Sequence, residues 1–560
     1  MSIRSFFEEN LRRCPDRIAF LFRRDKQICQ RTYAEAGVRV AAISELAAAI
    51  GVKPRTSPVA IILENGPLWI EIYLGHASMA VPVVPVDPKL RPEEISYMMN
   101  DSGVSVIYTD FKHVPVLQEI APKIEKLSAI VLVDGKAHSA PDQIAGRPVY
   151  DLESKIAEYA KTAASKDSVF AKSEVKEDDI ASVIYTSGTT GHPKGALITH
   201  ANFCADVDGA LSLFPQISGK DDFFIVLPLF HAFSFTTNFL VPIRIGAGMQ
   251  FTTSLRTIGD DMKAFKPSIM MAVPLLVEKM YAKVEDGINS SKAAKFLLSA
   301  GLGFIVVNKI RKSFGGRLRL LVVGGAPCSA KMLKAMRKLR MPIIEGYGLT
   351  EAAPIVSVSQ FEHFKPGTIG IPLPNIEVKI DNPNENGIGE LLVRGPIVMK
   401  GYLNKPEATA DTIDKDGWLH TGDLASQDEE KFITIRGRKK SLIVNREGKN
   451  IYPEEVEICI GHNPKILDVI VQGYADDQDE VGEKVGTIVV PNLDKFKRPD
   501  GTLPDWAEIE EETRKIVISQ CEHLAEYKHP RKIAVYKDPL ERTSSQKIRR
   551  YVYKDALNGK

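Results

Sequence analysis

The residues with the clearest chemical signature lie between Tyr185 and Gly195, where the sequence reads YTSGTTGHPKG. This stretch combines glycines, five hydroxyl side chains and Lys194. Glycines let backbone N–H groups turn toward one point without a Cβ clash, and converging N–H groups bind anions. The stretch therefore predicts a phosphate-binding loop. A plain flexible turn is the alternative for any loop rich in Gly, Ser and Thr.

The segments on either side predict a strand before this loop and a helix after it. Ala181–Ile184 is a short apolar run typical of a buried strand, and GALITHAN follows the lysine. The loop is not a Walker A motif, because it lacks the glycine spacing and the Gly-Lys-Ser/Thr ending of that motif.

Two later segments carry groups that suit a nucleotide. In GYGLTE, Tyr347 offers a ring for stacking, Thr350 a hydroxyl for phosphate and Glu351 oxygen ligands for Mg²⁺. The segment LLVVGGAP reads as a buried strand that ends where a flat ring could lie against bare backbone. Each segment alone also fits an ordinary strand-to-helix turn.

Three further residues are open to two readings. Asp423 in GWLHTGD could accept both hydroxyls of a ribose, or it could form an Asx turn. His231 in LPLFH is either structural or catalytic. Lys547 in TSSQKIRR is either a reactive-site cation or one member of a solvated basic tail.

Taken in chain order, YTSGTTGHPKG, LPLFH, LLVVGGAP, GYGLTE, GWLHTGD and TSSQKIRR resemble the motifs of the adenylate-forming superfamily, which includes acyl-CoA synthetases, luciferase-like enzymes and non-ribosomal adenylation domains. GRKK at residues 437–440 completes the set, and the resemblance covers roughly residues 30–550. Within the superfamily, GGRLRLLVVGGAP and KPSIMMAVPLLVEKMYAKV look most like long-chain fatty-acyl-CoA synthetases.

The resemblance implies that a medium- to long-chain fatty acid is activated by ATP, with Mg²⁺, as acyl-AMP. Coenzyme A then takes the acyl group, and AMP and pyrophosphate are released. A fatty carboxylate is already ionised near neutral pH (carboxyl pKa about 4), so the first step needs alignment and cations rather than a general base. Acyl carrier protein as acceptor, or another acid, is the alternative within this chemistry. A silent nucleotide- or lipid-binding protein is the alternative from another class.

The resemblance also implies which residues bind ATP. Those implied to hold the β- and γ-phosphates are Thr186, Ser187, Gly188, Thr189, Thr190, Gly191 and Lys194. Those implied to frame the adenine are Gly324, Gly325, Ala326, Tyr347 and Gly348. Those implied to bind the ribose are Asp423 and Arg438.

The implied reacting groups come from separate parts of the chain. Lys547 would reach the α-phosphate and the attacking carboxylate, and Thr350 would touch the α-phosphate. Glu351 and Thr186 would ligate Mg²⁺, and His231 would lie between the nucleotide and acyl sites.

The sequence departs from the family pattern at two places. Gln546 precedes the C-terminal lysine where Gly is usual, and Asn445–Pro453 is one residue longer than the commonest pattern. We therefore assign no residues to the thioester step.

The elements that must position these residues alternate between strand-like and helix-like segments, which predicts βαβ units and an α/β fold. We expect a large N-terminal adenylation domain and a mobile α+β C-terminal domain that rotates about Lys440. The expected divisions are 1–437 for the first domain, with α/β subdomains at about 1–175 and 176–365 and a small β-barrel at 366–437, and 438–560 for the second.

The composition narrows the partners and the location. Lys and Arg total 73 against 71 for Asp and Glu, so no strong field favours nucleic acid. Six scattered cysteines without a CxxC pair favour reduced thiols in a cytoplasm. The N-terminus lacks the apolar region of a signal peptide, and no apolar run is long enough to span a bilayer. The oligomeric state stays open.

Two apolar features leave alternatives. Residues 296–307 predict a buried helix with solvated basic ends. The alternative is an interfacial helix that helps a lipid substrate enter, with peripheral contact at the inner face of a membrane. Phe230, Phe233, Phe235 and Phe239 either line an apolar tunnel or belong to the core.

Overall fold

The computed structural model describes residues 1–186, 193–326, 328–447, 449–474, 482–542 and 548–557. Contacts divide the chain into two compact units, which are described separately. Unit 1 is Met1–Val378 with Val393–Leu419, and unit 2 is Lys379–Leu392 with His420–Lys560. The predicted domain boundary at 437/438 lies inside unit 2. It stays a prediction, because grouping by contacts in one structure does not test a rotation.

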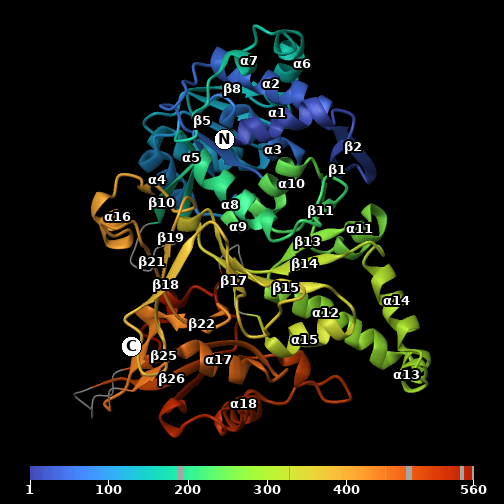
Figure 1. The fold of residues 1–560 in the computed structure, drawn as a ribbon, viewed down its shortest axis with the longest axis vertical. Coiled ribbons are helices and arrows are strands. Elements are labelled where there is room, and N and C mark those ends of the chain that lie inside the picture. The colour runs from blue at the N-terminus through green and yellow to red at the C-terminus, as the bar shows by residue number, and fades with distance from the viewer. Residues whose placement is uncertain (187–192, 327, 448, 475–481, 543–547, 558–560) are drawn as a thin grey trace. The chain divides into compact units, whose positions relative to one another are not determined.

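Over the described residues, unit 1 contains two nine-stranded sheets, each with a parallel centre and antiparallel outer strands (Figure 1). The first sheet has the order β17 (Ile371–Pro372), β16 (Ile355–Val358), β15 (Ile343–Gly348), β14 (Leu320–Val323), β13 (Ile269–Ala272), β11 (Asp222–Ile225), β12 (Gly248–Phe251), β1 (Ile18–Arg24), β2 (Gln27–Thr32). The second has the order β20 (Gly401–Tyr402), β10 (Lys194–Thr199), β9 (Ile180–Thr186), β4 (Val83–Pro85), β3 (Val59–Ile62), β5 (Val106–Thr109), β6 (Ala129–Leu132), β8 (Arg147–Asp151), β7 (Gln143–Ile144).

Successive residues of a strand point to opposite faces of the sheet. In the second sheet the residues on both faces are apolar, so helices cover both faces. In β3, Val59 and Ile61 belong to the larger core, whereas Ala60 and Ile62 belong to a separate core on the other face. The helices of unit 1 are α1 (Ile3–Arg13), α2 (Tyr33–Ala49), α3 (Pro67–Ala77), α4 (Pro92–Ser102), α5 (Val114–Ile120), α6 (Leu152–Ala163), α7 (Val169–Lys172), α8 (His200–Ser212), α9 (Ala232–Phe235), α10 (Val241–Ile245), α11 (Ile258–Phe265), α12 (Pro274–Ser290), α13 (Lys292–Ser299), α14 (Gly303–Ser313), α15 (Ala330–Lys338) and α16 (Pro406–Thr412).

The part of unit 2 that the structure describes combines small sheets with two longer helices. The four-stranded sheet β18 (Glu377–Asp381), β19 (Gly389–Arg394), β21 (Leu419–Gln427), β22 (Ile433–Arg438) occupies the region predicted as a small barrel. The remaining elements are β23 (Ile443–Val444), β24 (Asn450–Ile451), α17 (Pro453–Gly461), β25 (Ile466–Tyr474), β26 (Lys484–Pro491), α18 (Trp506–Cys521) and β27 (Lys532–Val535). The predicted α/β class with an α+β C-terminal part is confirmed.

The predicted helix directly after the phosphate loop is wrong. Lys194–Thr199 forms β10, which pairs antiparallel with β9 on one side and with β20 on the other. The helix α8 begins only at His200, where Thr199 accepts a hydrogen bond from the backbone of Asn202 in a capping box. The loop therefore closes a β-hairpin.

The predicted buried helix at residues 296–307 is also wrong. Two helices, α13 and α14, replace it, separated by a turn at residues 300–302. None of the residues of α13 is buried, and Phe296 is 68% exposed. Among the described residues, no helix is both long enough and apolar enough to cross a bilayer.

The aromatic cluster near His231 belongs to the core at two of its four positions. Phe235 and Phe239 are fully buried, with ring centroids 4.8 and 5.3 Å from that of Tyr73. Phe230 is also buried, whereas Phe233 is partly exposed. The tunnel interpretation is therefore wrong for Phe235 and Phe239.

Candidate functional site

Several of the predicted site residues meet at the carboxyl edge of the first sheet. Because β11, β13, β14 and β15 are parallel neighbours, their carboxyl ends share one edge. His231 precedes α9 beyond β11, Gly324–Ala326 follow β14, and Tyr347–Glu351 run from the end of β15 into a 3₁₀ turn. Ligands of open α/β sheets bind at this edge.

Glycines bring bare backbone together at this edge. A Cβ atom added at Gly324 would lie 3.1 Å from the carbonyl oxygen of Gly346. A Cβ atom at Gly348 would lie 1.8 Å from the carbonyl oxygen of Pro354, a distance that backbone cannot accommodate. The predicted adenine frame thus presents backbone, with the partly exposed ring of Tyr347 beside it.

The base of the predicted phosphate loop is the β9–β10 hairpin. Thr186 and Lys194 are register partners, and the Thr186 hydroxyl donates to the Lys194 carbonyl at 3.5 Å. Gly195 lets the hairpin close, since a Cβ there would lie 2.8 Å from Cγ1 of Val183. The predicted phosphate ligands Ser187, Gly188, Thr189, Thr190 and Gly191 lie outside the described residues.

Tyr402 links the two charged residues of this region. Its hydroxyl donates to Oε1 of Glu351 at 2.7 Å, and Nζ of Lys194 lies 5.0 Å from its ring centroid. Burial and then the neighbouring carboxylate raise the pKa of Tyr402, so the phenol stays protonated and donates. The β10–β20 pairing brings Tyr402 to this position.

The sequence analysis did not single out Tyr402. It lies in the region predicted only as a small β-barrel, and its pairing with β10 is long-range. A tyrosine in a short strand carries no signal in residue type or spacing that marks it as part of a charged site.

Buried hydrogen bonds hold the turn that carries Glu351. The backbone N–H of Met399 donates to the Glu351 carbonyl at 2.9 Å. The backbone N–H of Ile355 donates to both carboxyl oxygens of Asp206, at 3.2 and 3.3 Å. Burial raises the pKa of Asp206 well above its ordinary value. Thr236 donates to the carbonyl of Ala353 at 3.0 Å, which ties the turn to the segment after α9.

A buried carboxyl group supports the loop after β14. The backbone N–H of Cys328 donates to Oε1 of Glu345 at 3.2 Å. Burial raises the pKa of Glu345 to about 7, and the hydrogen bond from Cys328 partly opposes this shift. Glu345 is thus a positioning residue for the predicted adenine frame, and the sequence analysis missed it.

The carboxyl edges of the two sheets of unit 1 contact each other at Asn65, which follows β3. Its side chain donates to the carbonyl of Leu227 and accepts from the backbone N–H of Leu229, both at 2.8 Å. These bonds fix the segment that leads to His231, whose ring lies beside Phe230 with a centroid distance of 4.6 Å.

In unit 2, the two predicted ribose ligands contact each other. Asp423 and Arg438 are cross-strand partners, and Nε of Arg438 lies 2.8 Å from Oδ1 of Asp423. Asp423 is buried, whereas the Arg438 side chain is 55% exposed. The predicted hinge residue Lys440 follows in a 3₁₀ turn and is exposed. Lys547 lies outside the described residues.

The described residues contain no group of three or more His, Cys, Asp or Glu side chains that could hold a metal ion. Magnesium commonly takes a carboxylate together with water, hydroxyl and substrate oxygens as its ligands. Thr186 and Glu351 supply such oxygens, so the residues present fit the ion.

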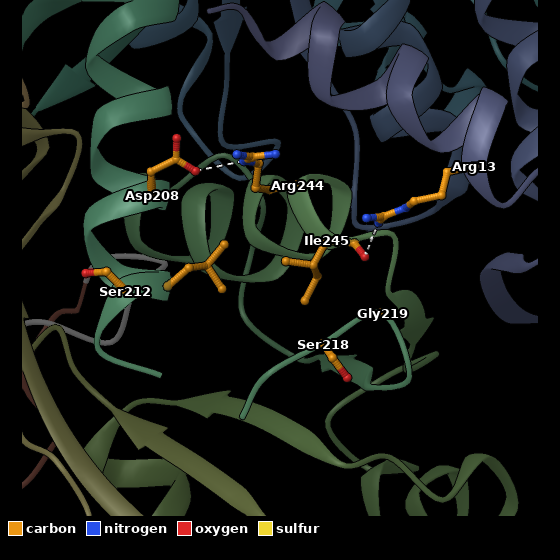
Figure 2. Close-up of a pocket in the computed structure, with 8 residues that line it drawn as sticks. Arg13, Asp208, Ser212, Ser218, Gly219, Arg244 and Ile245 are labelled. Atoms are coloured by element: carbon orange, nitrogen blue, oxygen red, sulfur yellow. Dashed lines mark hydrogen bonds and ion pairs between the residues drawn. The ribbon is translucent and has the colours of Figure 1, made fainter. Parts of the chain in front are cut away.

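A cavity of about 450 Å³ lies away from these residues (Figure 2). Ser218 and Gly219, on the amino side of β11, line it, whereas the predicted site lies beyond the carboxyl ends. Both arginines that line the cavity already have polar partners. Arg244 pairs with Asp208 at 2.7 Å, and Arg13 donates to the Ile245 carbonyl at 2.7 Å. None of the described predicted site residues lines this cavity.

Comparison with known proteins gives a family and relatives. The profile of the family described as "AMP-binding enzyme" matches residues 7–403. The chain is 30% identical to the long-chain-fatty-acid–CoA ligase FadD15 of Mycobacterium bovis over 73% of this chain and 69% of that protein. It is also 30% identical to a long-chain-fatty-acid–CoA ligase of Escherichia coli O157:H7, over 90% of this chain and 86% of that protein.

A solved structure shows the same fold. The o-succinylbenzoate coenzyme A synthetase of Bacillus subtilis, in complex with ATP and a magnesium ion, aligns with a TM-score of 0.72 at 24% identity. The alignment covers 99% of both chains.

Proposed function

The chain belongs to the AMP-binding enzyme family, and from this premise we propose that it is an ATP-dependent acyl-CoA synthetase for medium- to long-chain fatty acids. It is an AMP-forming acid–CoA ligase family enzyme, and relatives named as long-chain-fatty-acid–CoA ligases support the choice of acid. In the first half-reaction, a carboxylate oxygen attacks the α-phosphorus of ATP and pyrophosphate leaves. In the second, the thiol of coenzyme A attacks the acyl carbon and AMP leaves.

The observation that carries this proposal is the contact of Tyr402 with both Lys194 and Glu351 at the base of the glycine-rich loop. It sets one cation and one carboxylate beside a loop whose composition suits phosphate. Lys194 would offset phosphate charge, and Glu351 with Thr186 would hold Mg²⁺. When bound, the ion neutralises charge on the phosphate oxygens.

The other roles follow from the resemblance and from the backbone geometry. Gly324–Ala326 and Tyr347 would frame the adenine, and Thr350 would contact the α-phosphate. His231 would separate the nucleotide from the acyl chain. Asp423 and Arg438 would bind the ribose as the ion pair that they already form, and Lys547 would act on the α-phosphate.

The test is acid-dependent exchange of labelled pyrophosphate into ATP, measured with acids of graded chain length. The proposal predicts exchange that rises from short acids to a maximum among medium or long chains. Absence of exchange with every acid would contradict the proposal that the chain is an enzyme. A maximum with an aromatic or short acid would contradict only the proposal that its substrate is a fatty acid.

A second assay identifies the acceptor. Preformed acyl-AMP is offered either coenzyme A or acyl carrier protein, and the proposal predicts thioester formation with coenzyme A. Preference for the carrier protein would replace the acceptor without changing the first half-reaction. The six free cysteines favour a cytoplasmic location as part of this proposal.

A further inference from the structure

The helices α13 and α14 of unit 1 expose large apolar side chains around the turn that joins them. Phe296 is 68% exposed and Phe304 is 55% exposed, and Leu298, Leu302 and Ile305 are exposed as well. Together with the turn, these five residues are called the apolar tip below. Exposed apolar residues that occur singly are ordinary, but a contiguous group marks an interaction surface.

The opposite face of α14 anchors the pair to unit 1. Val306 and Ile310, four residues apart, are buried. Phe304 and Ile305 are exposed near the start of the helix, and Lys309 and Lys312 are exposed near its end. The exposed surface of α14 thus changes along its axis from apolar at the turn to cationic at the far end.

The same gradient runs along α13 in the opposite chain direction. Lys292 and Lys295 are exposed near its start, and Phe296 and Leu298 are exposed toward the turn. Residues 291–313 contain five basic and no acidic side chains. At 1.5 Å per residue, the exposed lysines of both helices lie roughly 7–15 Å from the turn at residues 300–302 along the helix axes.

We propose that α13 and α14 dock on an anionic lipid bilayer, with the apolar tip inserted and the cations level with the lipid headgroups. Interfacial helices bury their apolar side chains about 5–10 Å deep, so insertion of the turn to that depth would bring the nearer lysines to the headgroups. A cluster of four to eight basic residues on such a helix is typical of binding to anionic lipid.

The charge argues against a second copy of this chain as the occupant. A second copy would offer this surface the same five cations and no acidic side chain from residues 291–313, so its charge would not be complementary. An anionic bilayer would bury the apolar side chains among the acyl chains and pair the cations with lipid headgroups.

The test is co-flotation of the full chain with vesicles of equal parts phosphatidylcholine and phosphatidylglycerol, compared with vesicles of phosphatidylcholine alone. We expect binding to the anionic vesicles that weakens with added salt. Lys309→Gln with Lys312→Gln should weaken it by about 25-fold, because each cation near the surface contributes about fivefold. Phe296→Ser with Phe304→Ser should abolish flotation.

The matched control is Leu255→Ser, since Leu255 is 67% exposed but lies outside α13 and α14. It should float like the unchanged protein, and far-ultraviolet circular dichroism verifies that every variant is folded. Equal flotation of the control and the tip variant would overturn the proposal. So would a dimer in sedimentation velocity that only the tip variant dissociates. The assay needs no substrate, so its outcome is independent of the proposed reaction.

Discussion

At the scale of single residues, the candidate site depends on one side chain that carries no charge. Tyr402 donates to Glu351, and its ring centroid lies 5.0 Å from Nζ of Lys194. In the proposed function, the cation would bind phosphate and the carboxylate would bind a metal ion.

Tyr402→Phe should raise the Mg²⁺ concentration needed for half-maximal pyrophosphate exchange by about tenfold, because the groups that orient a metal ligand tune metal affinity. The ring beside Lys194 is retained, so the KM for ATP should change less. The control is Tyr33→Phe, which removes a buried phenol that donates to the Ala247 carbonyl at 2.8 Å. An unchanged Mg²⁺ dependence in Tyr402→Phe would show that this hydrogen bond does not support a metal site.

Gly348→Ala should lower the free energy of unfolding by at least about 2 kcal/mol, because overpacking against backbone cannot be relieved by a side-chain rotation. The added Cβ would lie 1.8 Å from the Pro354 carbonyl oxygen. Gly287→Ala in α12 is the control. Its Cβ would meet no atom within 4 Å, and alanine should stabilise that helix by up to about 1 kcal/mol. Thermal unfolding of both variants measures the contrast, and equal midpoints would contradict the geometry at Gly348.

At the scale of elements, local sequence predicted the strands whose residues are buried on both faces. The apolar run Ala181–Ile184 became part of β9, which is longer by one residue at its start and two at its end, and the strand in LLVVGGAP became β14. Such strands are recognisable because their hydrophobic residues are continuous. Gly324 and Gly348 were predicted only through the family resemblance, since each segment alone also fits an ordinary strand-to-helix turn.

Local sequence failed where distant pairing decides the structure. Lys194–Thr199 became a strand because β9 and β20 flank it, and β20 lies far along the chain. The sequence did not predict Tyr402 or Glu345 as site residues for the same reason. Each contacts the site only because strand pairing brings it there. The apolar run at residues 296–307 predicted burial, but hydrophobic character does not say which surface will cover it.

Glu345 makes β15 sensitive to pH. Its pKa of about 7 in the folded chain exceeds the ordinary 4.5, so the folded state binds more protons than the unfolded state between these values. The free energy of unfolding should therefore fall as the pH rises from about 4.5 to 7, by roughly 3 kcal/mol from this group. Glu345→Gln should flatten that dependence, as measured by chemical denaturation across the window. An identical pH slope in both proteins would exclude Glu345 as its source.

At the scale of the whole molecule, the two steps of the proposed reaction, adenylate formation and thioester formation, need different protein groups beside the same acyl group. The two compact units and the resemblance to adenylate-forming enzymes support a division of these steps between parts of the chain. Variants that separate the half-reactions test this division without any knowledge of how the units move.

Lys547→Ala should lower pyrophosphate exchange by at least about 10², the loss typical of a removed electrostatic donor. Thioester formation from supplied acyl-AMP should be largely retained, because the α-phosphate has already been attacked by then. Lys554→Ala, another lysine near the end of the chain, is the control and should leave both half-reactions intact. Equal losses in both half-reactions of Lys547→Ala would refute the assignment to adenylation.

Lys440→Pro should give the opposite pattern. Proline fixes φ near −65°, so it would restrict a rotation about this residue that the second step is proposed to need, whereas the first step is proposed to need none. Pyrophosphate exchange should persist, whereas the rate of thioester formation should fall by at least about tenfold, equivalent to about 1.4 kcal/mol in the barrier. Lys440→Ala removes the charge but keeps the backbone free, so it should preserve the thioester step. If alanine and proline slow that step equally, the Lys440 side chain matters and the hinge is elsewhere. If neither slows it, no rotation about Lys440 is needed for the reaction.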